Sequence, residues 1–407
     1  MTRLHVFVLS CLFPLAMCQA QNSGWDYSVF YNREDSMRHA YWRIQAYPQA
    51  VAVLRVLHRE YQVLDESLRA QYRWLDAATL YNIACAYSLQ DSIEPALNAL
   101  RRSIDEGFTD YATMSADADL KNLHGASGYE QLLASVKERG DYLYVLQKTG
   151  GYIGDENRER PKFTYQTPAD SNLQRLRHLY NLDSVAGSGP DVDQIVRLMK
   201  WAHKIVRHDG NSTNPSSRNA IDLIQVCEKE NRGVNCRMMA TILNEAYLAM
   251  GFSSRHVTCM PKDTADHECH VITIVYAPSQ QQWLWMDPTF EGYVTDDAGR
   301  FLGVAEVRER LRNGDSVAAA PELNWNGKPY DGGSSGYLKR YMAKNLYWFS
   351  CPVSSEFGYE SKSGQHEYVH LYPGDYNPFR RDMGRLIKGH DYYTNDADYF
   401  WSPPEKK

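Results

Sequence analysis

The hydrophobic pattern is clearest in the middle of the chain, where a helix-like run is followed by two strand-like runs. Across residues 238–250, apolar side chains recur at intervals of three and four, which predicts an amphipathic helix that stops at Gly251. Residues 270–276 then alternate in a β-rich pattern, and residues 283–287 repeat it after the polar turn at 279–282. We therefore expect one helix followed by a β-hairpin.

The start of the predicted helix carries the first candidate for chemistry. Asn235 stands where an N-cap residue belongs, so Cys236 falls in the first helical turn. The helix dipole and the free backbone N–H groups favour a thiolate there, and the thiolate is the reactive form of cysteine. A small buried cysteine is the alternative interpretation of the same position.

The ends of the predicted hairpin carry two further candidates. His270 opens the first strand and Asp287 closes the second, so antiparallel pairing brings a carboxylate next to an imidazole. If the hairpin docks at the helix start, Cys236 gains a base and an orienting group, as acyl transfer requires. His267 is a rival base, but it lies in a polar loop, and we prefer His270 because a strand holds it in place.

Two other interpretations of these residues stay open. Asp287 precedes Pro288 and could be an ordinary turn-forming residue. Four side chains could instead be zinc ligands, although they lack the paired spacing of structural zinc sites: Cys259, His267, Cys269 and His270. We expect neither a metal nor a cofactor.

The three candidates lie in motifs that resemble the transglutaminase-like superfamily. The motifs read GVNCR from Gly233, MGFSSRHV from Met250, CHVITIVY from Cys269 and WLWMDPTF from Trp283, and the resemblance covers residues 163–350. It implies a papain-like core with a Cys236, His270 and Asp287 triad. Arg237 follows the nucleophile where animal cross-linking transglutaminases carry Trp. In this respect the chain resembles the bacterial branch, for which the resemblance implies hydrolysis of amide bonds.

The expected fold is α+β, with a papain-like transglutaminase core preceded by an all-α, repeat-like region. In this core the helix bearing the nucleophile packs on an antiparallel sheet. The expected function is acyl transfer at amide bonds through a thioester, with water resolving it, on a protein or a cell-wall peptide. The alternatives are an amine-accepting transglutaminase and a non-catalytic module that binds protein or glycan through the helical region.

Upstream of this core, residues 36–147 show helical periodicity. Residues 80–108 resemble a tetratricopeptide repeat, with small and bulky residues where two antiparallel helices pack. A single repeat cannot bury its apolar face alone, so the segment needs flanking helices. It could be a docking surface for peptides or only a spacer.

Shifts in composition along the chain divide it into five parts. We expect a signal peptide at 1–20, the helical region at 21–150, a linker at 151–162, the core at 163–352 and a C-terminal extension packed on the core at 353–407.

Within the core and beyond the hairpin, further elements follow the same patterns. Helices are expected at 191–208, 220–227 and 306–312, a Gly-rich loop at 324–337, and a strand at 341–351. The loop 208–214 is a candidate substrate rim. His208 itself is expected to be a surface or capping residue.

Composition and the N-terminal segment bear on the partners and the localisation of the protein. The chain has 407 residues, 43% of them hydrophobic, and a formal net charge of −6. This charge offers no electrostatic case for nucleic acid binding, and the sequence shows no clustered Lys/Arg stripe with interleaved aromatic residues. Arg3, the apolar run at 4–17 and the small-residue exit at 18–20 predict a secretory signal that is cleaved after Ala20, and Cys18 is a candidate lipid acceptor. We therefore expect a secreted, periplasmic or envelope protein with no transmembrane span.

Overall fold

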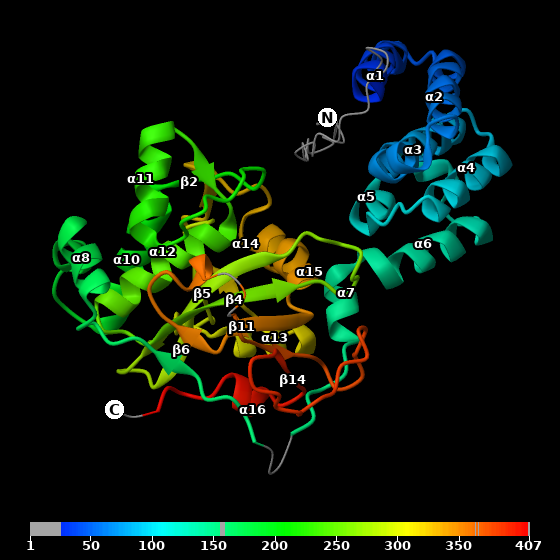
Figure 1. The fold of residues 1–407 in the computed structure, drawn as a ribbon. Helices are drawn as coiled ribbons and strands as arrows, with labels where there is room; N and C mark the ends of the chain where they lie inside the picture. Colours follow the sequence, from blue (N-terminus) through cyan, green and yellow to red (C-terminus); the bar gives the residue numbers. More distant parts are fainter. Residues whose placement is uncertain (1–25, 155–158, 363, 365, 406–407) are drawn as a thin grey trace. The chain divides into compact units, whose positions relative to one another are not determined.

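The computed structural model describes residues 26–154, 159–362, 364 and 366–405. The predicted signal peptide and Cys18 lie outside these residues. The chain forms two compact units that divide between Val145 and Leu146 (Figure 1). Within the described part of the chain, no helix is both long enough and apolar enough to span a membrane.

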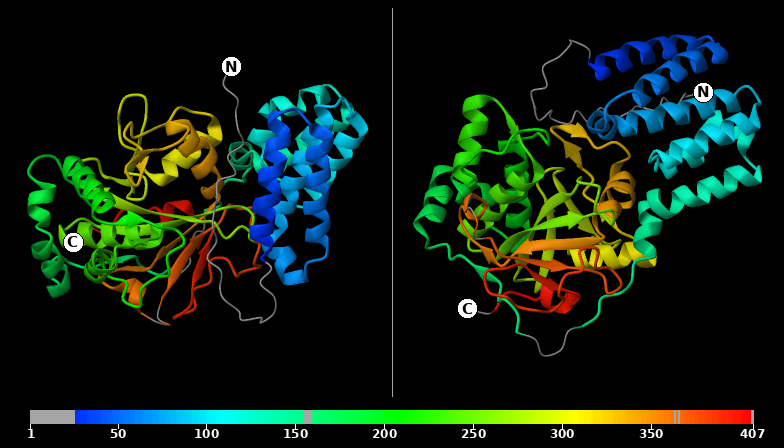
Figure 2. Two further views of the ribbon diagram at one scale, coloured as in Figure 1. Left: turned by 90° about the horizontal axis from the view of Figure 1, so that it is seen from above. Right: turned by 45° about the vertical axis from the view of Figure 1, so that its right-hand side comes forward.

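In its described residues the first unit contains helices and no strands, which confirms the expected helical region before the core. Successive helices pack against one another, α1 on α2, α2 on α3 and α3 on α4, and both views of Figure 2 show them side by side. Leu54, Leu80 and Leu100 lie fully inside its core. The resemblance to a tetratricopeptide repeat stays a prediction. The elements are α1 (Tyr27–Arg43), α2 (Tyr47–Gln62), α3 (Glu66–Ser88), α4 (Ile93–Asp105), α5 (Tyr111–Ala116), η1 (Ala118–Leu123), α6 (Ser127–Gly140) and α7 (Tyr142–Gln147), which contains the division.

The second unit is built on an eight-stranded sheet in the order β14-β13-β11-β4-β5-β6-β7-β8. The sheet is mixed, which corrects the expected antiparallel sheet: β13 and β14 run parallel, while every other neighbouring pair is antiparallel. A long connection between β13 and β14 allows this parallel pairing. The strands are β4 (Ser254–Met260), β5 (His270–Ala277), β6 (Gln282–Asp287), β7 (Gly292–Thr295), β8 (Ala318–Ala319), β11 (Trp348–Pro352), β13 (Tyr368–Leu371) and β14 (Tyr392–Thr394).

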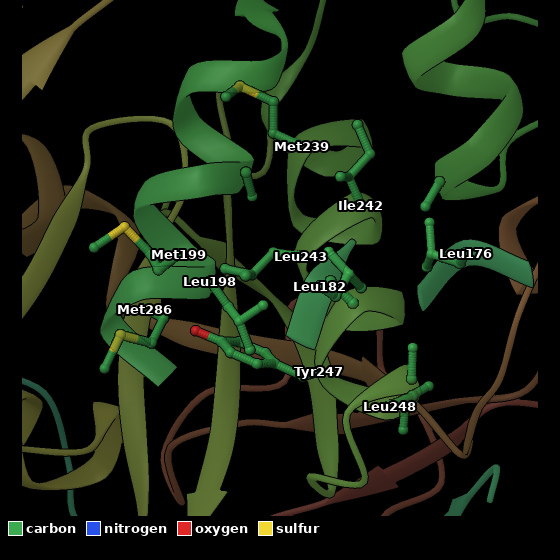
Figure 3. Packing of buried hydrophobic residues seen from close by; sticks show 14 of the residues in the cluster. Leu176, Leu182, Leu198, Met199, Met239, Ile242, Leu243, Tyr247, Leu248 and Met286 are labelled. Atoms are coloured by element: carbon green, nitrogen blue, oxygen red, sulfur yellow. The ribbon is translucent and has the colours of Figure 1, made fainter. Parts of the chain in front are cut away.

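Helix α12 (Cys236–Ala249) is the central helix of this unit and packs on β4 and β5. Its whole length from Met238 to Ala249 is buried, because other helices cover the face turned away from the sheet. Figure 3 shows Leu243 and Tyr247 beside Leu198, and Met239 and Met199 belong to the same buried cluster. The surrounding helices are α8 (Ser171–Leu179), α9 (Leu182–Ala186), α10 (Asp191–Ile205) and α11 (Ala220–Glu230), and α13 (Val304–Asn313) lies further along the chain.

Several local predictions hold. The helix, the turn and the hairpin of β5 and β6 form where the pattern placed them, and Asn235 caps α12 as expected. The side chain of Asn219 caps α11 in the same way. The helix expected at 191–208 ends at Ile205, and the one expected at 306–312 forms as α13.

The segment before β11 differs from its prediction. The expected Gly-rich loop contains a short hairpin, and the expected strand at 341–351 begins only at Trp348, after a π-helical turn. The aromatic residues that favoured a strand serve tertiary packing here instead. The elements are β9 (Asn324–Trp325), β10 (Lys328–Pro329), α14 (Gly333–Ser335), the π-helical η2 (Gly336–Met342) and α15 (Ala343–Asn345).

Short pieces complete the second unit. They pair or cap the main elements, and β2 with β3 forms a two-residue parallel ladder next to the start of α12. They are β1 (Thr164–Tyr165), β2 (Arg207–His208), β3 (Gly233–Val234), β12 (Ser354–Ser355), η3 (Tyr359–Ser361) and α16 (Ala397–Phe400).

A buried carboxyl group fixes α12 among its neighbours. Glu245 is 1% exposed, and its two oxygens accept hydrogen bonds from the backbone N–H of Ala220, at 2.7 Å, and of Gly358, at 2.8 Å. The first donor lies at the start of α11, where helix N–H groups lack intrahelical partners. One side chain of α12 therefore holds both α11 and the turn that precedes η3.

We predict that Glu245→Ala lowers the free energy of unfolding by about 2–5 kcal/mol, because two backbone N–H groups inside the protein lose their acceptor. Urea unfolding followed by tryptophan fluorescence measures it. Glu228→Ala, on the exposed face of α11, is the matched control and should change stability by no more than about 0.5 kcal/mol. Equal stability of the two variants would mean that Glu245 does not hold these segments.

Candidate active site

Cys236 lies at the N-terminal end of α12 and is partly exposed to solvent. The Asn235 side chain accepts a hydrogen bond from the backbone N–H of Met238 at 3.1 Å, which caps the helix. Its amide nitrogen donates to Asn214 at 2.9 Å, so the loop after β2 is tied to the same point. The thiol thus lies at the positive end of the helix dipole.

His270 and Asp287 lie side by side at the ends of β5 and β6. The distance from His270 Nε2 to Asp287 Oδ2 is 2.7 Å, and the two residues are 1% and 0% exposed. The other carboxylate oxygen of Asp287 accepts the backbone N–H of Thr289 at 2.9 Å. Because Asp287 occupies Nε2, the nitrogen of His270 left for the thiol is Nδ1.

Two tyrosines that the sequence analysis did not single out complete this pair. The Tyr337 hydroxyl donates to Asp287 Oδ2 at 2.6 Å, and the Tyr341 hydroxyl lies 3.1 Å from His270 Nδ1. Both come from the π-helical turn η2, a local distortion that is frequent at functional sites. Their spacing of four residues was the available signal, but it lay in a segment predicted to be a loop and a strand.

The electrostatics of the cluster favour an ion pair between cysteine and histidine. Burial opposes ionisation of Cys236, but hydrogen bonds from His208 and His270 outweigh it and lower the pKa of the thiol to about 5. For His270, burial works against the charged ring, whereas Asp287 and Cys236 favour it and raise its pKa to about 10. At neutral pH the site therefore holds a thiolate and an imidazolium.

The remaining cysteines are chemically different. Those in the described residues are free thiols, and burial raises the pKa of every one except Cys236. The rival base His267 lies exposed in the loop before β5. Among the described residues, no group of three or more His, Cys, Asp or Glu side chains is arranged to hold a metal ion.

His208 corrects the sequence analysis. It was expected at the surface or as a cap, but its ring is partly buried and helps to lower the pKa of the Cys236 thiol. The misplacement came from the turn-rich sequence after it, which hides the two-residue strand β2. Its pairing with β3 brings His208 opposite Val234, two residues before Cys236.

Arg237 points into a polar network behind the nucleophile. Its guanidinium donates to Thr258 Oγ1 at 3.0 Å and lies 3.5 Å from a carboxylate oxygen of Glu360. His256 contacts the same oxygen at 3.2 Å. Burial opposes ionisation of Glu360, but His256 and Arg237 hold its pKa well below the usual range. The charge of Arg237 is thus balanced within the protein.

The arrangement has the parts of a nucleophilic site. A thiolate sits at a helix N-terminus, an imidazolium faces it, and a buried carboxylate orients the ring. Such a group can attack a carbonyl carbon and then protonate a leaving group.

Comparison with known proteins identifies part of the chain. Residues 180–288, which include Cys236, His270 and Asp287, match the model of the transglutaminase-like superfamily. A curated chloroplastic protein from Arabidopsis thaliana is 31% identical over 58 residues, which are 14% of this chain and 17% of that protein. The chain therefore spans about a sixth of the length of that curated relative.

A solved structure of a proposed cysteine protease from Cytophaga hutchinsonii was also found. It is 16% identical, and the match covers 42% of this chain and 58% of that one, with a TM-score of 0.25. The family match rests on residues 180–288 alone. The chain therefore carries a transglutaminase-like domain at residues 180–288, in which the helix start and the hairpin of the candidate site both lie.

Proposed function

We propose that this protein is a cysteine enzyme that cleaves amide bonds by acyl transfer through a thioester on Cys236. The observation that carries the proposal is the position of Cys236 at a helix N-terminus together with an imidazole that a buried carboxylate orients. This environment lowers the pKa of the thiol to about 5. A thiol of this kind is ionised without help from the substrate, and an ionised thiol is a strong nucleophile.

In the first half of the reaction, the Cys236 thiolate forms a bond to the carbonyl carbon of the substrate amide, and the π electrons move to oxygen. The backbone N–H of Cys236, in the first turn of α12, is a donor for this oxyanion. When the oxyanion collapses, the C–N bond breaks. The leaving nitrogen takes the proton from His270 Nδ1, which leaves a thioester and a neutral imidazole.

In the second half, water attacks the thioester while His270 takes its proton. Collapse of this second oxyanion breaks the C–S bond, and the products are the carboxylic acid and the Cys236 thiolate facing a recharged imidazolium. Asp287 stabilises the imidazolium in both halves through its 2.7 Å hydrogen bond. No cofactor takes part in the proposed steps.

We favour water over an amine as the acceptor because of Arg237. Where cross-linking transglutaminases are expected to carry an indole, this chain places a guanidinium that is turned toward Thr258 and Glu360. This position therefore supplies no aromatic wall for an incoming amine.

The proposed substrates are proteins or cell-wall peptides outside the cytoplasm. This part of the proposal rests on the N-terminal segment 1–20, whose basic start, apolar run and small-residue exit are typical of a secretory signal. Lipid attachment at Cys18 would keep the enzyme at the cell envelope.

The ionisation of Cys236 gives a prediction that needs no substrate. Iodoacetamide should alkylate Cys236 with a rate that rises through about pH 5, far below the ordinary range of a thiol. His270→Ala removes the positive charge facing the sulfur, so the midpoint should move toward alkaline pH, and the rate at pH 6 should fall at least tenfold. Peptide mass spectrometry of Cys236 follows the reaction.

Two further variants separate the partners of the thiol. Asp287→Asn should shift the midpoint less than His270→Ala, because the amide still accepts the ring N–H but no longer favours the imidazolium. The exposed His267→Ala is the matched control and should leave the profile unchanged. A shift in His267→Ala without one in His270→Ala would assign the base to the other histidine.

The choice of acceptor gives another prediction. With a glutamine-containing peptide and a labelled primary amine, ammonia and free glutamate should form faster than labelled peptide, and Cys236→Ala should abolish both reactions. Mass spectrometry separates the two products, which differ in mass. Amine incorporation that outpaces acid formation would make the protein an amine-accepting transglutaminase.

A further inference from the structure

His208 is held against the nucleophile by a close contact of two backbone segments. Strand β2 pairs in parallel with β3, and His208 lies opposite Val234. This approach requires glycine at position 233, because a Cβ there would lie 2.6 Å from the carbonyl oxygen of Arg207 and 2.7 Å from Cβ of Asp209. The absence of a side chain at Gly233 thus allows His208 to lie close to Cys236.

A short hairpin holds His208 from the other side. Asn326 accepts the backbone N–H of His208 at 2.8 Å and donates to its carbonyl oxygen at 2.9 Å. Asn326 and Gly327 both have positive φ, +51° and +79°, which suits the tight turn between β9 and β10. The indole Nε1 of Trp325 donates to His208 Nδ1 at 2.9 Å.

The indole contact determines which ring nitrogen of His208 carries a proton. An indole N–H can only donate, so Nδ1 of His208 must be an unprotonated acceptor. The ring is then neutral with its proton on Nε2, and this N–H is the group available to hydrogen-bond the Cys236 sulfur. His208 differs here from His270, whose partner is a carboxylate that stabilises a charged ring.

We propose that His208 is a catalytic residue whose Nε2–H is the second oxyanion donor, and that Trp325 is the positioning residue that holds its tautomer. The inference rests on the proposed function and names a group that the proposal leaves open. His208 is unsuited to act as a base, because its acceptor nitrogen Nδ1 already accepts the indole N–H and its other ring nitrogen carries the proton.

The step balances without any further reactant. As the C–S bond forms, the carbonyl π electrons move to oxygen, and the sulfur loses the negative charge that attracted the His208 N–H. The N–H then donates to the new oxyanion, bonded to the carbon that the sulfur has joined. No proton leaves His208 in this step. When the second oxyanion collapses and the C–S bond breaks, the thiolate is released and the His208 N–H can again donate to the sulfur.

The test compares two reactions of the same sulfur in the full chain. Alkylation by iodoacetamide forms no oxyanion, whereas acylation by p-nitrophenyl acetate does. At pH 9, where the thiol is ionised, His208→Ala should slow acylation about 10²–10³-fold while alkylation stays within about threefold of wild type. Release of p-nitrophenolate and mass spectrometry of Cys236 measure the two rates.

Three further variants separate catalysis from structure. His208→Gln keeps a side-chain N–H donor and should recover at least part of the acylation rate. Trp325→Phe keeps an exposed ring but frees both tautomers of His208, so acylation should fall about tenfold with alkylation unchanged. His178→Ala, an exposed histidine on α8, is the control and should match wild type in both reactions.

The outcomes distinguish this inference from the proposed function. If wild-type Cys236 is alkylated but never acylated by the ester, the proposed function is wrong and the inference falls with it. If wild type is acylated and His208→Ala is acylated equally fast at pH 9, the inference alone is overturned. Loss of both reactions to the same extent in His208→Ala would make its role purely structural and would also overturn it.

Discussion

A single buried negative charge, the carboxylate of Asp287, organises the candidate site. A carboxylate removed from water is costly unless hydrogen bonds and an opposite charge compensate it. Here the compensation comes from the backbone N–H of Thr289, the hydroxyl of Tyr337 and the ring of His270. The strands β5 and β6 and the π-helical turn must therefore meet at one point. The charge that Asp287 confers on His270 in turn favours the Cys236 thiolate.

Helix α12 carries the nucleophile, and parts of the chain far from it hold it in position. Glu245 binds backbone N–H groups of Ala220 and Gly358, and Arg237 pairs with Glu360. Two of these partners belong to the segment after β12, well beyond the matched domain at 180–288. The residues 353–407 thus support the position of the thiol, in addition to adding β13 and β14 to the sheet.

The hairpin of β9 and β10 contacts His208 directly and reaches the His270–Asp287 pair through a third histidine, His203. Its Asn324 side chain contacts His203 Nε2 at 2.8 Å, and His203 Nδ1 donates to the carbonyl oxygen of Pro288, directly after Asp287, at 2.9 Å. Trp325 and Asn326 hold His208. A displacement of this hairpin would therefore move His208 and, through His203, the segment that carries Asp287. The site is a contact network of separate chain segments rather than a local motif.

The sequence by itself determined the elements whose residues interact with near neighbours. The period of α12, its cap at Asn235 and the alternation of β5 and β6 depend on contacts within one turn or one strand pair, so the pattern located Cys236, His270 and Asp287 on them. Tertiary structure decided the rest. The places of His208, Tyr337 and Tyr341, the parallel entry of β14 and the late start of β11 depend on segments distant in sequence. No local periodicity records such contacts, because their free energy comes from charge compensation and packing between segments that meet only in the folded chain.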